Sequence, residues 1–134
     1  MAFLLDTDTC IYALKQNERV LRRLLSTARE DVVVSVITEA ELRTGAAKSS
    51  SPVRTLHLLE NFLRPLALID FTSEDASAYA NVRAKLERAG TPIGPLDTLI
   101  ASQAVARKLT LVSNNEREFR RVMGLVVENW SRLG

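Results

Sequence analysis

The sequence contains almost none of the residues from which proteins build zinc sites or disulfides. It has one cysteine, Cys10, and one histidine, His57. A single cysteine excludes an intrachain disulfide and weakly favours a reducing compartment. Two such residues are also too few for a zinc site. Cys10 lies in an apolar stretch, so we expect a small core residue rather than a nucleophile.

Long apolar runs and a strong excess of charge are missing as well. No run approaches the ~18 apolar residues of a membrane span, and the amino-terminal residues lack the pattern of a secretory peptide. We therefore expect a cytoplasmic protein without membrane contacts. The net charge is only +2, so nucleic acid would need a local basic patch. The arginines between Arg19 and Arg29 form either such a patch or a solvated helix face.

Strand and helix patterns alternate along the 134 residues, which suit one domain spanning 1–134. Short apolar or β-branched runs predict strands at 2–5, 31–35, 66–69, 109–112 and 125–128. Helical spacing predicts helices at 9–15, 18–28, 38–47, 53–63, 73–89, 96–108 and 116–121. The alternation predicts an α/β fold, a parallel five-stranded sheet flanked by helices on both faces.

Four acidic residues stand beside these elements: Asp6, Glu41, Asp97 and Glu118. Asp6 ends the first strand, and Glu41 and Glu118 follow the second and fourth strands. Asp97 opens the helix that leads into the fourth strand. Because ligands in such folds bind outside the carboxyl ends of the strands, we expect the four acids to meet there.

A cluster of four carboxylates is costly unless something positive lies in it, because like charges repel in a partly desolvated cleft. Oxygen ligands of this kind suit Mg²⁺, with Mn²⁺ as a substitute. An ion held there could activate a water and stabilise a leaving oxygen in phosphodiester hydrolysis. The hydroxyls of Thr7 and Ser113, and the amides of Asn114 and Asn115, would support the cluster.

Each acid also has a purely structural interpretation. Asp6 or Asp8 could cap the first helix, and Glu41 could pair with an N-cap Thr38 in a capping box. Asp97 could be a first-turn acid favoured by the helix dipole, and Glu118 an exposed helix residue. Only the set, placed at strand ends, favours the metal interpretation.

The residues around these acids resemble the PIN-domain endoribonucleases, and within them the VapC toxins of VapBC toxin–antitoxin pairs. The resemblance runs from Phe3 to about Trp130 and rests on four motifs. They are Leu5-Asp6-Thr7-Asp8, Ser35-x-x-Thr38-x-x-Glu41-Leu42-x-x-Gly45, Ile93-Gly94-Pro95-x-Asp97-x-Leu99-Ile100-Ala101 and Leu111-Val112-Ser113-Asn114-Asn115-x-x-Glu118-Phe119. The third and fourth together are specific, whereas the first alone is weak.

By this resemblance the four acids match the family's catalytic positions, and Ser113 matches its hydroxyl position, with Thr7 and Asn115 in support. Asp6 and Asp97 would bind the metal, and Glu41 and Glu118 would do so directly or through water. Two departures stand out. Asp8 replaces the usual Asn and either joins the site or caps the helix. Glu118 stands where many relatives have Asp.

The resemblance implies a Mg²⁺-dependent endoribonuclease toxin that cuts structured RNA, with tRNA as the usual target, and thereby inhibits translation. It implies a VapB antitoxin as neutralising partner, a homodimer, and a toxin–antitoxin hetero-oligomer that contacts operator DNA only through the antitoxin.

Three alternatives stay open at this point. A haloacid-dehalogenase-like phosphohydrolase would use Asp6 as a nucleophile and Asp8 as its acid/base. A receiver-like domain would accept phosphate on Asp70 at the end of the third strand, but its lysine is missing where Glu128-Asn129 stand. A PIN-like binding module would keep the fold without turnover.

Overall fold

The five strands form one sheet in which every neighbouring pair is parallel, in the order β3-β2-β1-β4-β5. The computed structural model describes residues 2–132. The strands are β1 (Phe3–Leu5), β2 (Val32–Ser35), β3 (Ala67–Ile69), β4 (Thr110–Val112) and β5 (Val126–Glu128). The predicted α/β class and the five parallel strands are therefore confirmed.

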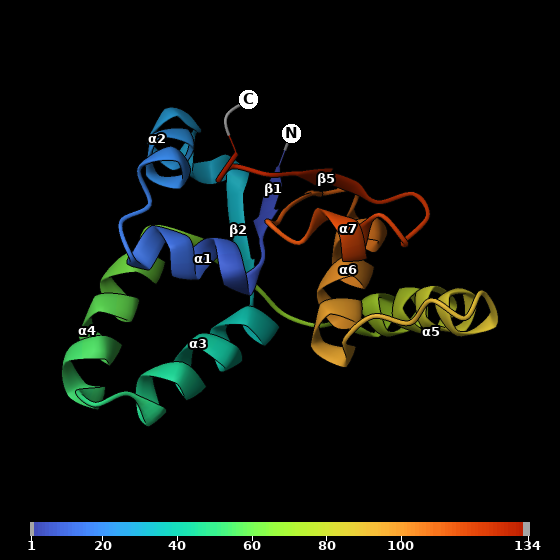
Figure 1. Cartoon of the computed structure of the whole chain (residues 1–134), viewed down its shortest axis with the longest axis horizontal. Coiled ribbons are helices and arrows are strands. Elements are labelled where there is room, and N and C mark those ends of the chain that lie inside the picture. Colours follow the sequence, from blue (N-terminus) through green and yellow to red (C-terminus); the bar gives the residue numbers. More distant parts are fainter. Residues whose placement is uncertain (1, 133–134) are drawn as a thin grey trace.

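Helices connect the strands and cover both faces of the sheet (Figure 1). They are α1 (Thr7–Leu14), α2 (Glu18–Ser26), the short 3-10 helix η1 (Arg29–Asp31), α3 (Val36–Lys48), α4 (Pro52–Leu63), α5 (Ser73–Arg88), α6 (Pro95–Arg107) and α7 (Glu116–Phe119). In Figure 1, α1 to α4 lie to one side of β1 and β2, and α5 to α7 lie to the other. None of the helices in residues 2–132 is long and apolar enough to cross a membrane.

Alternation along the strands divides the core in two, because successive side chains point to opposite faces. Leu5 and Val34 pack with Cys10 and Trp130 on the face covered by α1, α2 and α4. Leu4 and its neighbours pack on the other face against α5 and α6. Cys10 is fully buried, which confirms it as a small core residue.

The start of α3 differs from the sequence prediction. We expected Thr38 as N-cap with Glu41 as its capping-box partner. Instead the helix begins at Val36, and the Ser35 hydroxyl caps it by accepting a bond from the Ile37 N–H at 3.0 Å. Both Ser35 and Thr38 have the chemistry of an N-cap. The earlier one caps because β2 runs directly into α3, which leaves Glu41 free for another role.

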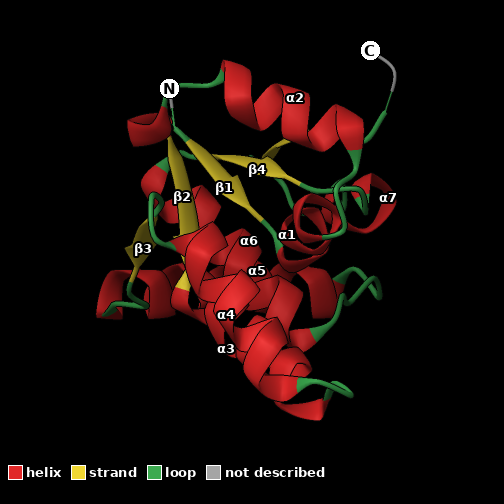
Figure 2. Ribbon diagram, turned by 90° about the vertical axis from the view of Figure 1, so that its left-hand side faces the viewer, coloured by secondary structure: helices red, strands yellow, loops and turns green. Residues whose placement is uncertain are grey.

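The topology places a crevice at the end of β1. From β1 the chain moves to β2 and β3 on one side, then crosses to β4 on the other side. Such a switch point opens a crevice outside the carboxyl ends of the two central strands. β1 and β4 pair in register from Phe3 with Thr110 to Leu5 with Val112, and Figure 2 shows β1, β2 and β4 as neighbours. Asp6 and Ser113, the next residues along each strand, therefore lie side by side.

Candidate active site

Asp6 forms the floor of this crevice. Its backbone N–H donates to the Val112 carbonyl at 3.0 Å, and only 3% of the residue is exposed. One carboxylate oxygen accepts the Thr9 N–H at 2.8 Å, so Asp6 also caps α1. Burial raises the pKa of Asp6 to about 6, although hydrogen bonds from the Ser113 hydroxyl and Thr9 oppose the rise. The capping and site interpretations of Asp6 are therefore compatible.

Glu41 reaches the same crevice from α3. The Thr7 hydroxyl donates to Glu41 Oε1 at 2.6 Å, and its oxygen lies 3.2 Å from the Thr38 hydroxyl. These bonds connect the first turn of α1 to the second turn of α3 across 34 residues of sequence. Thr38, which does not cap the helix, instead helps to hold Thr7 and thereby Glu41.

Asp97 and Glu118 close the opposite side. Glu118 Oε1 accepts the Gly94 N–H at 2.9 Å, and its other oxygen accepts a bond from the Asn115 amide. A side chain added at Gly94 would lie 3.7 Å from Asp97 Oδ2 and 4.0 Å from Glu118 Oε1. The two carboxylates therefore border the same backbone position, just before α6. Ser113 is buried and accepts the Asn115 N–H at 2.9 Å, which fixes the loop between β4 and α7.

The four acids act on one another electrostatically. Burial raises the pKa of Asp97 to about 6, and the negative charges of Glu118, Asp6 and Glu41 add to the rise in that order. Asp8 is exposed and contributes the smallest of these charges. Among residues 2–132 none of the four forms an ion pair. The structure thus places all four acids that the sequence singled out within electrostatic reach of one another, without an ion pair in residues 2–132. We call this group of four the carboxylate pocket.

The chemistry of these side chains fits a hard divalent cation, which prefers carboxylate oxygens and water. Within the described chain, however, no three acidic, histidine or cysteine side chains already converge as a complete ligand set. Hydrogen-bond donors of the protein hold two of the four carboxylates, which explains why the acids do not converge. Glu41 is turned toward Thr7, and Glu118 toward Gly94 and Asn115, whereas Asp97 accepts no such bond in residues 2–132.

Sequence reasoning missed a polar network behind the loop that carries Ser113 and Glu118. Asn114 donates to the Tyr12 hydroxyl at 3.1 Å and accepts bonds from Asn129 at 3.3 Å and Ser131 at 2.9 Å. Asn129 also donates to Glu116 at 3.1 Å. The segment after β5 thereby clamps the β4–α7 loop onto α1. No local spacing reveals this, since the bonds join residues up to 102 positions apart.

Known proteins resemble this chain over nearly its whole length. The family model described as "PIN domain" matches residues 3–125. The "tRNA(fMet)-specific endonuclease VapC" of Salmonella typhimurium is 39% identical, over 97% of this chain and 98% of that protein. This chain belongs to the VapC family of PIN-domain ribonuclease toxins. "Ribonuclease VapC2" of Rickettsia felis is 38% identical, over 98% of this chain and all of the relative.

Solved VapC structures have the same fold. The DNA-bound VapBC of Salmonella typhimurium aligns with a TM-score of 0.93 and 40% identity, over 97% of this chain and 98% of that one. VapBC2 of Rickettsia felis, bound to a DNA fragment from its promoter, aligns with a TM-score of 0.92 and 37% identity, over 97% of this chain and 99% of that one. Membership of the VapC family removes the haloacid-dehalogenase and receiver alternatives. Nucleases of this family are typically metal-dependent.

Proposed function

We propose that this VapC-family chain is a Mg²⁺-dependent endoribonuclease that cuts initiator tRNA through the carboxylate pocket of Asp6, Glu41, Asp97 and Glu118. The observation that carries the proposal is four acids gathered around one crevice without an ion pair in the described chain. The name of the Salmonella relative supports the substrate, since that protein is called tRNA(fMet)-specific.

Asp6 and Asp97 are the proposed direct ligands. Both carboxyls have a pKa of about 6, so both are largely ionised at neutral pH although burial opposes ionisation. When bound, the metal supplies charge neutralisation at the phosphate and an activated water. Glu118 accepts protein hydrogen bonds on both carboxylate oxygens, so we assign it a contact through water, whereas Glu41 accepts one only on Oε1 and would contact the metal directly or through water.

The hydroxyl and amide groups hold these acids in place. Thr7 orients Glu41 and Asn115 orients Glu118, while the neighbouring Ser113 hydroxyl lowers the pKa of Asp6. The Ser113 hydroxyl stabilises the ionised form of Asp6 against burial, which keeps a ligand charged where the chemistry needs it. These three residues are therefore positioning residues rather than ligands.

The proposed partners follow the solved relatives. VapBC complexes from Salmonella typhimurium and Rickettsia felis contain toxin, antitoxin and DNA. We propose that a VapB antitoxin neutralises this chain, that the toxin is a homodimer within the hetero-oligomer, and that operator DNA is contacted only through the antitoxin. A single PIN domain spanning 1–134 would perform the toxin's part.

The test is digestion of total bacterial RNA by the purified, antitoxin-free protein with Mg²⁺, with Mn²⁺ and with EDTA, alongside Asp6→Asn. We expect discrete cuts in the tRNA fraction that need metal and vanish in the variant. If folded protein cleaves nothing under any condition, the chain is a binding module without turnover. Cuts that persist in EDTA or in Asp6→Asn would remove the carboxylate pocket from the mechanism.

A further inference from the structure

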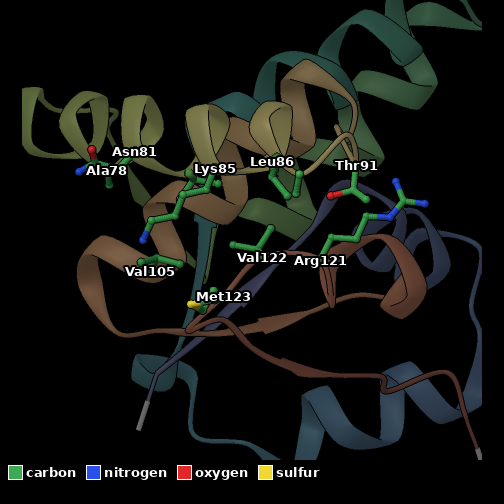
Figure 3. Close-up of a pocket in the computed structure, with 11 residues that line it drawn as sticks. Ala78, Asn81, Lys85, Leu86, Thr91, Val105, Arg121, Val122 and Met123 are labelled. Carbon is green, nitrogen blue, oxygen red and sulfur yellow. The ribbon is translucent and has the colours of Figure 1, made fainter.

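A cavity lies between α5 and the segment that follows α7. Its volume is about 350 Å³, which is within the usual range for ligand pockets. Figure 3 shows Leu86 of α5 and Val122 facing one another across its middle. Met123 forms part of the rim and is 82% exposed. Leu86 and Val122 are themselves only 4% exposed and form the apolar base of the cavity, so Met123 supplies most of its open apolar surface.

Two cations border this apolar surface at different ends. Lys85 extends over Val105 and Met123 on one side, and Arg121 lies beside Thr91 on the other (Figure 3). Among residues 2–132 neither Lys85 nor Arg121 forms an ion pair. Several arginines elsewhere on this surface do, for example Arg83 with Glu87. No carboxylate in the described residues therefore competes with a ligand for these two cations.

The cavity is connected to the carboxylate pocket through one short segment. The Arg121 guanidinium donates to the Pro92 carbonyl at 3.0 Å. Two residues further on, the Gly94 N–H donates to Glu118. The segment that forms a wall of the cavity therefore also forms an edge of the acidic pocket.

RNA needs cations near the acidic pocket because four carboxylates repel its phosphates. Phosphate contacts supply most of the sequence-independent affinity for a nucleic acid. An unpaired nucleotide offers an apolar base face with a phosphate at either end, and bases pack on apolar side chains and guanidinium planes in proteins that bind single strands. This matches an apolar surface with a cation at each end.

We propose that this cavity binds an unpaired nucleotide of the RNA substrate next to the cleaved bond, with its base on Met123 above the apolar base of the cavity and its flanking phosphates on Lys85 and Arg121. The inference rests on the proposed nuclease function and deepens it. It makes Lys85 and Arg121 substrate-binding residues outside the metal pocket.

The test separates RNA binding from catalysis. Affinity for labelled initiator tRNA is measured in EDTA at several salt concentrations, and cleavage is measured separately with Mg²⁺. Lys85→Ala with Arg121→Ala should raise Kd in EDTA and KM with Mg²⁺ about tenfold. The slope of log K against log salt should fall by about 1.4, since each single-strand phosphate contact contributes about 0.7. Lys85→Arg should restore most of the binding.

Arg88→Ala is the matched control, because Arg88 is an exposed cation on α5 that does not line the cavity. Arg121→Ala also removes the Arg121–Pro92 bond. If this loss disturbs the segment before α6, the affinity and salt slope of Lys85→Ala alone test the inference. If the variants bind RNA with the same affinity and salt slope as a wild type that cleaves RNA, the inference is overturned and the proposed function stands. A changed oligomeric state with unchanged RNA affinity would also overturn it, because the face would then bind a second copy. No cleavage by the wild type would instead count against the nuclease proposal.

Discussion

Asp6→Asn should make the protein more stable while it abolishes metal-dependent cleavage. Burial raises the pKa of Asp6 from 3.8 to about 6. At about 1.4 kcal/mol for each unit of pKa, ionising this carboxyl costs the folded state about 3 kcal/mol. Asparagine carries no charge and caps a helix about as well as aspartate, so the Thr9 N–H keeps its acceptor. We expect a gain of about 1–3 kcal/mol at pH 8.

The gain must depend on pH with a defined sign. Below pH 3.8 the carboxyl is neutral in both the folded and the unfolded wild type, so its burial costs little. As the pH rises through about 6, the folded state must ionise a buried group and the wild type loses that stability. The free-energy gap between the variant and the wild type should therefore open between pH 4 and pH 6 and stay constant above.

Urea unfolding in EDTA at pH 4, 6 and 8 measures this gap. Asp8→Asn is the control, since Asp8 is an exposed acid two residues away. Adding Mg²⁺ should then stabilise the wild type and not Asp6→Asn, by about 2.7 kcal/mol when Mg²⁺ is 100 times its Kd. A variant that is less stable at pH 8, or a gap that does not change with pH, would refute the reasoning.

Three further predictions concern the residues that support the site and the fold. Ser113→Ala should lower kcat without abolishing cleavage and should raise the apparent pKa of the rate profile, because Ser113 stabilises ionised Asp6; an unchanged pH–rate profile would exclude it. Asn129→Leu should lower kcat with little change in KM, since Asn129 holds the active-site loop; a rise in KM alone would contradict this. Burial raises the pKa of Asp75, but hydrogen bonds from Arg107 and others outweigh it and hold the pKa at about 2. Asp75→Asn should therefore cost about 1–3 kcal/mol at pH 7, a loss that urea unfolding should show fading as the pH falls from 4 toward 2.

The sheet was predictable from the sequence because parallel strands buried on both faces are short continuous apolar runs. The runs that begin at Phe3 and Val32 carry no polar interruption until Asp6 and Ser35. The position of Asp6 was predictable for the same reason, since it directly follows β1. That the four acids form one site stays a prediction.

The start of α3 and the support of the loop were harder, for different physical reasons. Ser35 and Thr38 have equivalent capping chemistry, and only the direct junction of β2 with α3 decides between them. The bonds of Asn114 with Tyr12 and Asn129 join distant segments, so no local pattern contains them. Tertiary contacts of this kind become visible only when the segments are placed in space.

The most direct measurement is the rate of cleavage of purified initiator tRNA in Mg²⁺ by the wild type and by Asp97→Asn. Asp97 is the acid whose pKa depends on the charges of the other three, and it accepts no hydrogen bond from other groups in residues 2–132. The variant should fold and still bind tRNA, but it should show no cleavage above background. Cleavage at the wild-type rate would contradict the claim that these four carboxylates form one metal-dependent nuclease site.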